Sequence, residues 1–125
     1  MKILAISDSH MFNDQLVRIT SKYKGYYPTI DAIEVFVSRY GEHINLSQGL
    51  YPQLAQKYNT SCYSIECNIH TIVRKVYRHN KKLLEILLDK ELEKCPSNYL
   101  FLESIAFQIW NKNRIGDISP PGSDN

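Results

Sequence analysis

Small polar side chains followed by basic ones mark the middle of this chain as a candidate nucleic-acid-binding surface. If residues 61–78 form one helix, an apolar stripe faces inward and a polar stripe stays outside. Short polar side chains can approach base edges, and cations bind phosphates. The polar side chains expected to face bases are Ser61, Ser64, Cys67, Asn68 and Thr71. The cations expected to bind phosphates are Lys57, Arg74, Lys75, Arg78 and Lys81.

Net charge is concentrated in the same region. Residues 51–82 hold six Lys or Arg and one acidic residue, whereas residues 26–50 and 83–103 carry net charges of −2 and −3. A basic segment of this kind attracts a polyanion. A solvated helix face can have the same composition, so charge alone leaves both interpretations open.

Two other clusters contain metal-ligating residue types. Asp8 and His10 resemble the first metal-binding pair of calcineurin-like metallophosphoesterases, but the later motifs of that class are missing and the chain is short for its fold. Cys62, Cys67 and His70 lack the paired-cysteine spacing of structural zinc sites. We therefore expect no metal site, no catalytic residues and no cofactor.

Length and composition exclude several classes of protein. The chain has 125 residues, 43% of them hydrophobic, which suits one domain with a single core. No apolar run approaches the ~18 residues of a membrane span, and the amino terminus does not resemble a signal peptide. Three cysteines cannot all pair within one chain. We therefore expect free thiols, a cytoplasmic location and no membrane partner.

The residues before the basic stretch fit the first half of a helix-turn-helix. Ala55 is small enough to let two helices cross closely, in a helix that we expect to begin near Gly49. Asn59 tolerates the left-handed conformation that the turn requires. Ser61 can cap the second helix, and Ile65 supplies its apolar anchor. An ordinary α-hairpin would share this pattern.

Apolar spacing predicts an all-α domain of about six helices that contains this helix-turn-helix. We expect Thr29 to cap a helix that Gly41 closes, and Ser97 to cap the last helix. Further helices are expected at residues 13–23 and 81–94, and a short strand at residues 2–7. The expected organisation is an N-terminal extension at 1–23, the DNA-binding domain at 24–113 and a disordered tail at 114–125.

Several of these residues together resemble the C-terminal DNA-binding domain of the stage 0 sporulation response regulator. The most specific match is LYPQLAQKYNTS at residues 50–61, and the resemblance covers roughly residues 24–110. It implies a transcription factor of endospore-forming bacteria that binds a short promoter box as a tandem dimer. It also implies that Glu66 and His70 face the bases. Weaker matches are Lys24-Gly25-Tyr26, Ala32-Ile33, Ile65-Glu66, Ile69, Pro96-Ser97-Asn98, Phe101 and Ala106.

The chain departs from the family pattern in two respects. Ser64, Cys67 and His70 stand where the family has arginines, and each lost bidentate guanine contact removes about 1–3 kcal/mol of discrimination. The family's receiver domain has no counterpart here beyond residues 2–8. We therefore expect altered or weakened DNA reading and no control by phosphorylation.

These observations favour a sequence-specific DNA-binding transcription regulator, with double-stranded DNA as its partner, and not an enzyme. The alternative is a protein-interaction module that pairs with or antagonises a full-length regulator. In that case the apolar last helix would dock through Phe107 and Trp110. Either function allows a homodimer or a heterodimer with the full-length regulator.

Overall fold

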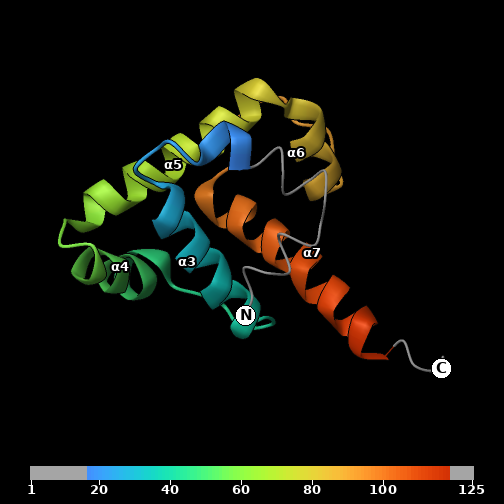
Figure 1. Cartoon of the computed structure of the whole chain (residues 1–125), viewed down its shortest axis with the longest axis horizontal. Helices are drawn as coiled ribbons and strands as arrows, with labels where there is room; N and C mark the ends of the chain where they lie inside the picture. Colours follow the sequence, from blue (N-terminus) through green and yellow to red (C-terminus); the bar gives the residue numbers. More distant parts are fainter. Residues whose placement is uncertain (1–16, 119–125) are drawn as a thin grey trace.

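The structure, a computed structural model, describes residues 17–118, with side chains described for residues 17–111. The described residues form helices and connecting loops without a strand, which confirms the all-α class (Figure 1). After a short helical turn at residues 17–20, the elements are α3 Tyr26–Ser38, η1 Leu46–Leu50, α4 Tyr51–Lys57, α5 Cys62–His79, α6 Lys81–Leu88 and α7 Asn98–Ile118.

One apolar core lies between α3, α5 and α7, and α4 and α6 close its ends. The stripes expected in the helices around Ile65 and Ile105 are confirmed, since both side chains are fully buried. Burying one large apolar side chain contributes about 1.5–3 kcal/mol. The largest fully buried side chains are Phe101, Ile65, Ile69, Leu84, Leu102, Ile105, Val73 and Val76.

Helix α3 begins earlier than its sequence pattern indicates. Gly25 is the N-cap residue, and the N–H of Thr29 donates to Gly25 O at 2.9 Å inside the first turn. The prediction of Thr29 as the N-cap is therefore wrong, because this β-branched side chain is buried in the core instead. Pro28 is tolerated there because the first-turn N–H groups have no helical partner. The helix ends at Ser38, and Gly41 follows with φ 97°.

The helix expected to begin near Gly49 begins earlier and in two parts. The carboxamide oxygen of Asn45 accepts the N–H of Gln48 at 3.0 Å and starts the short, wide helix η1. The N–H of Leu50 reaches Asn45 O, also at 3.0 Å, across a wider turn than an α-helix allows. Helix α4 then begins at Tyr51, so Pro52 falls in its first turn.

Helix α6 ends at Leu88, well before the end expected at residue 94. Asp89 adopts the left-handed conformation, with φ 57°, and the N–H of Lys90 donates back to Glu85 O at 3.2 Å. The following loop still buries Leu92, whose N–H donates to Glu85 Oε2 at 2.8 Å. The apolar spacing continues past the end of α6 because Leu92, although it lies in a loop, is also buried in the core.

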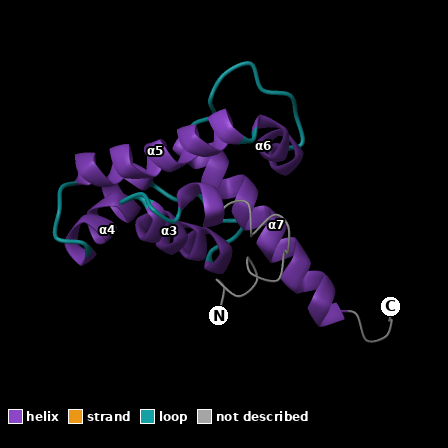
Figure 2. Ribbon diagram, turned by 45° about the horizontal axis from the view of Figure 1, so that its top comes forward, coloured by secondary structure: helices purple, strands orange, loops and turns teal. Residues whose placement is uncertain are grey.

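Helix α7 begins as expected and continues further than expected. The hydroxyl of Ser97 accepts the N–H of Leu100 at 3.1 Å, which confirms Ser97 as the cap. The helix passes Arg114, the first residue of the expected tail, and ends at Ile118, so the tail predicted at residues 114–125 begins in a helix. Its carboxyl-terminal part extends away from the other helices (Figure 2).

Some predicted features lie outside the described residues. These include the strand at residues 2–7, Asp8 and His10, and the first part of the helix expected at residues 13–23; the described end of that helix shows one helical turn at residues 17–20. Within residues 17–118, none of the helices has the length and apolar character needed to cross a membrane.

Candidate nucleic-acid interface

A tight turn at Asn59 connects α4 to α5. Asn59 has φ 55°, which confirms the left-handed residue expected there. The N–H of Thr60 donates to Ala55 O at 2.9 Å and closes the end of α4. The hydroxyl of Ser61 then accepts the N–H of Ser64 at 3.0 Å, which confirms the cap of α5. The turn is therefore fixed by local contacts at both of its ends.

Helix α5 has one buried face and one exposed face. Ile65, Ile69 and Val76 are among its core residues, whereas Cys67 and Arg74 are exposed. Figure 1 shows α5 along one edge of the molecule, where its exposed face meets solvent. We call the exposed and half-buried residues opposite the core the outer stripe. It consists of Tyr63, Ser64, Cys67, Thr71, Arg74 and Arg78.

Tyr63 belongs to the outer stripe but was not among the residues expected to face bases. Its side chain is 75% exposed in the first turn of α5. A hydrogen bond with Cys67 raises the pKa of Tyr63, so the phenol stays neutral at physiological pH. The signal that could have found it is its spacing, because Tyr63 lies four residues before Cys67 on the same side of the helix.

The polar groups of the outer stripe differ in what they can offer a base. Thr71 donates its hydroxyl to Cys67 O at 2.9 Å, one helical turn back. Its hydroxyl oxygen and its methyl group then remain for an incoming ligand. Ser61 and Ser64 bond to each other at 3.1 Å between hydroxyl oxygens at the helix start. Short side chains of this kind leave room for base edges to approach α5.

His70 lies on one flank of α5 and contacts α7. Its Nδ1 lies 2.9 Å from Asn98 Oδ1. The amide nitrogen of Asn98 donates to Tyr51 OH at 3.0 Å and to Glu66 O at 3.2 Å. Because the carbonyl oxygen of Glu66 can only accept, the amide oxygen of Asn98 must face His70, and His70 Nδ1 carries a proton. We call this cluster the Asn98 joint. It engages His70, which was expected to face bases, in a contact within the domain.

The two remaining residues expected to face bases lie on the flanks of α5. Glu66 is exposed on the flank that faces α7, where its backbone carbonyl belongs to the Asn98 joint. Asn68 is half-buried on the opposite flank, and its backbone carbonyl lies against Gly25. The structure therefore groups Ser64, Cys67 and Thr71 and separates them from Glu66 and Asn68.

Lys57 is committed to a partner within the domain. Its Nζ lies 2.8 Å from Asp31 Oδ2, and the hydroxyl of Tyr58 donates to the same carboxylate oxygen. Burial raises the pKa of Tyr58, and the neighbouring Asp31 carboxylate raises it further, so the phenol remains a donor at neutral pH. Lys57 is still 60% exposed, so a phosphate that contacts its ammonium group would compete with the Asp31 carboxylate.

The cations of α5 and of the start of α6 differ in their surroundings. Arg74 and Arg78 are exposed, and no ion pair within the described residues involves either of them. Lys75 is half-buried, with Nζ 5.3 Å from the centre of the Tyr23 ring. Lys81 lies 4.0 Å from a carboxylate oxygen of α6. The two arginines are thus the strongest candidates for phosphate contacts.

The domain with this arrangement matches a known family over most of its length. Residues 14–109 match the family described as sporulation initiation factor Spo0A, C-terminal. The chain belongs to this family. Members of the Spo0A C-terminal family are DNA-binding domains of sporulation transcription regulators. No curated protein and no solved structure matches the chain.

The Spo0A C-terminal match covers most of the residues that the structure describes. The match begins at residue 14, upstream of the boundary expected at residue 24. Residues 17–25, which contact α5 through Tyr23 and Gly25, thus lie within the family domain. The match ends at Ile109, just before Trp110.

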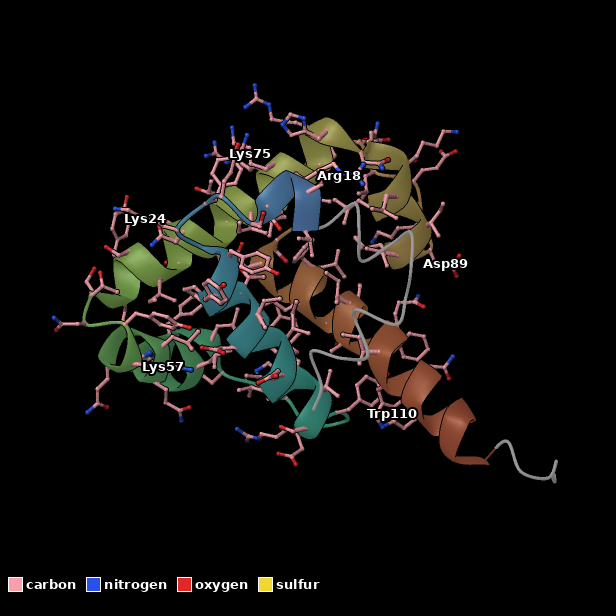
Figure 3. All side chains as sticks on the ribbon, viewed as in Figure 1. Arg18, Lys24, Lys57, Lys75, Asp89 and Trp110 are labelled. Carbon is pink, nitrogen blue, oxygen red and sulfur yellow. The ribbon has the colours of Figure 1, made fainter. Side chains whose placement is uncertain are left out.

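Aromatic side chains gather where the end of α3 meets α7. The rings of Tyr40 and Trp110 stack with centres 4.5 Å apart and planes 19° apart. Phe107 lies 6.0 Å from Tyr40 between ring centres and is 41% exposed. Figure 3 places Trp110 at the opposite end of the molecule from Lys24 and Lys75. We call Tyr40, Phe107 and Trp110 the aromatic cluster.

Among residues 17–111, whose side chains the structure describes, no group of three His, Cys, Asp or Glu side chains has a geometry that could hold a metal ion. Cys62 and Cys67 are exposed free thiols, and Cys95 is half-buried. Burial raises the pKa of the Cys95 thiol, which disfavours its thiolate.

Proposed function

We propose that this domain binds double-stranded DNA sequence-specifically as a transcription regulator, with α5 in the major groove. The observation that carries the proposal is the composition of the outer stripe. Its first half has the small side chains of Ser64, Cys67 and Thr71 beside Tyr63, and its second half has Arg74 and Arg78. A helix that enters the groove by its amino terminus needs this order, because bases lie at the bottom of the groove and phosphates at its edges.

The turn at Asn59 supports this placement of α5. In a helix-turn-helix, the first helix crosses the backbone and the second helix is presented to the groove. Here α4 and the capped start of α5 hold the amino-terminal half of the outer stripe at the surface. Ser64 and Cys67 then lie where the first base contacts form, with Tyr63 beside them.

Selection of bound duplexes from a random pool tests the proposal directly. We expect a recurring sequence, and binding to that duplex should weaken steeply as salt rises because phosphate contacts release counterions. A pool without enrichment, together with no salt-dependent binding at low ionic strength, would overturn the proposal.

A paired comparison of variants tests the assigned roles. Arg74→Ala with Arg78→Ala should reduce the slope of log Kd against log salt by roughly two units, one for each lost phosphate contact. The control, Lys90→Ala with Lys94→Ala, removes the same charge from the loop after α6, where both lysines are exposed. An equal loss of slope in both variants would show that net charge, rather than α5, controls binding.

The aromatic cluster favours a second candidate function, association with another copy of this domain. Phe107 is 41% exposed, and an exposed aromatic group rimmed by polar residues is typical of a protein contact. Sedimentation equilibrium of the domain and of Phe107→Ser tests it, since self-association should disappear in the variant. A monomer at all concentrations would contradict it. A mixture with a full-length regulator would then test the heterodimer.

A further inference from the structure

Residues 17–25, which we call the basic arm, hold three cations and no acidic residue. The cations are Arg18, Lys22 and Lys24, and all three are exposed. The arm is folded by its own backbone hydrogen bonds, including Ser21 N–H to Val17 O at 2.9 Å and Tyr23 N–H to Thr20 O at 3.1 Å. Its positive groups are therefore carried on a defined turn.

The arm contacts α5 through the backbone at Gly25. A Cβ atom on Gly25 would lie 2.1 Å from Asn68 O and 3.0 Å from Ile72 Cγ1. Only glycine allows so close an approach, because the obstructing atom belongs to the backbone of α5. The contact fixes the arm along the flank of α5 opposite the Asn98 joint.

The ring of Tyr23 is contacted by one lysine of the arm and by one lysine of α5. Lys22 Nζ lies 5.6 Å from the ring centre, and Lys75 Nζ lies 5.3 Å from it. Tyr23 itself packs against the core. Each ammonium group lies within cation–π distance of the same ring, so the positive charges of Lys22 and Lys75 both lie at this ring on the arm side of α5. Figure 3 shows Lys24, Lys75 and Arg18 along the same edge of the molecule as α5.

The position of Lys75 on α5 shows what this flank would meet. Lys75 is eight residues from Cys67, which turns it about 80° around the helix from the middle of the outer stripe. When the outer stripe faces the floor of a major groove, a flank at this angle faces a phosphate strand, because the groove is about as wide as a helix with its side chains.

We propose that the basic arm is a second phosphate-binding element, in which Lys22 and Lys24 act with Lys75 on one DNA strand along this flank of α5. The inference rests on the proposed function, since it requires α5 to lie in the groove. Phosphate contacts carry no base information, so the arm adds affinity and fixes the orientation of α5 without changing the sequence that is read.

The test compares two double variants on the duplex selected by the unmodified domain. Lys22→Ala with Lys24→Ala removes two exposed charges from the arm, and Lys90→Ala with Lys94→Ala removes two exposed charges from the loop after α6. The arm variant should lose about two units of salt slope and about tenfold or more in affinity at 0.1 M salt. The control should lose much less, and both should keep the same preferred sequence.

The outcomes separate this inference from the function on which it rests. If the unmodified domain binds the selected duplex and the arm variant keeps its slope and affinity, the arm inference is overturned and the proposed function stands. An altered preferred sequence in the arm variant would also overturn it, since the arm would then contact bases. If the unmodified domain binds no duplex with salt dependence, the proposed function fails and the arm inference fails with it.

Discussion

The two flanks of α5 are held by different kinds of contact. On the flank toward α7, the side chain of Asn98 joins His70, Tyr51 and the backbone of Glu66 through hydrogen bonds within the domain. On the other flank, the basic arm touches α5 through Gly25 and brings Lys22 and Lys75 to one aromatic ring.

The difference suggests two roles: one flank positions α5, and the other flank is able to bind an anion. Hydrogen bonds in a partly buried joint orient a helix, and the groups that form them are less available to a ligand. The exposed lysines of the arm and the half-buried Lys75 on the opposite flank add less to folding, since charges near the surface contribute little stability. The Asn98 joint therefore fixes how α5 projects, and the arm flank remains able to bind an anion.

The largest expected effect concerns the close contact of the arm. Gly25→Ala should lower the free energy of unfolding by about 3 kcal/mol, because the new Cβ would lie 2.1 Å from a backbone oxygen of α5. Chemical denaturation measures this loss. Gly49→Ala is the matched control, since its Cβ would meet only Asn45 Cβ at 3.9 Å, and it should be neutral or slightly stabilising. An equal change in unfolding free energy in the two variants would show that the arm does not pack closely against α5 at Gly25.

The next effect concerns the Asn98 joint. Asn98→Ala leaves His70 Nδ1, Tyr51 OH and Glu66 O without their shared partner, and it should cost about 2 kcal/mol of unfolding free energy. Tyr51→Phe removes only one hydroxyl from the joint and should cost about 1 kcal/mol. Urea denaturation of both variants compares them. A larger loss in Tyr51→Phe than in Asn98→Ala would contradict the central place of Asn98.

The smallest effect concerns Tyr23. Tyr23→Leu removes the ring that Lys22 and Lys75 share, while an apolar side chain still packs on the core, so we expect a loss of about 0.5–1 kcal/mol. Tyr27→Leu alters a ring that is 66% exposed and should change stability by less than about 0.5 kcal/mol. Thermal unfolding of Tyr23→Leu and Tyr27→Leu at two salt concentrations measures the stability of both variants. If Tyr23→Leu is neutral at low salt, the ring does not hold the lysines.

Local rules predicted much of the interface from sequence. Asn59 tolerates a left-handed conformation, and Ser61 and Ser97 cap helices through their own hydroxyls, so each is determined by neighbours a few residues away. The buried stripe of α5 follows from helical spacing alone. The outer stripe is then predicted as the opposite face of the same helix. Tyr63 was left out of that prediction, although its spacing from Cys67 places it on this face.

Contacts between distant segments could not be predicted in this way. His70 meets Asn98 across 28 residues, and no spacing rule indicates that its ring faces α7 instead of solvent. The same is true of Gly25 and Asn68, whose approach depends on how α3 begins. The early end of α6 at Asp89 was missed because the leucine pattern continues into the loop, where Leu92 is also buried.

The native cysteines offer the most direct test of whether the outer stripe faces DNA. Cys67 is exposed in the middle of the stripe, and Cys95 is half-buried beyond α6. Alkylation by iodoacetamide, followed by mass spectrometry, measures each thiol with and without the selected duplex, at a saturation established by fluorescence anisotropy. We expect saturating duplex to slow alkylation of Cys67 by about tenfold or more, because an interface excludes the reagent from the residues that it covers. Cys95 lies in the loop between α6 and α7, and its alkylation should slow by much less. An unchanged rate at Cys67 under saturating duplex would contradict the placement of α5 in the groove.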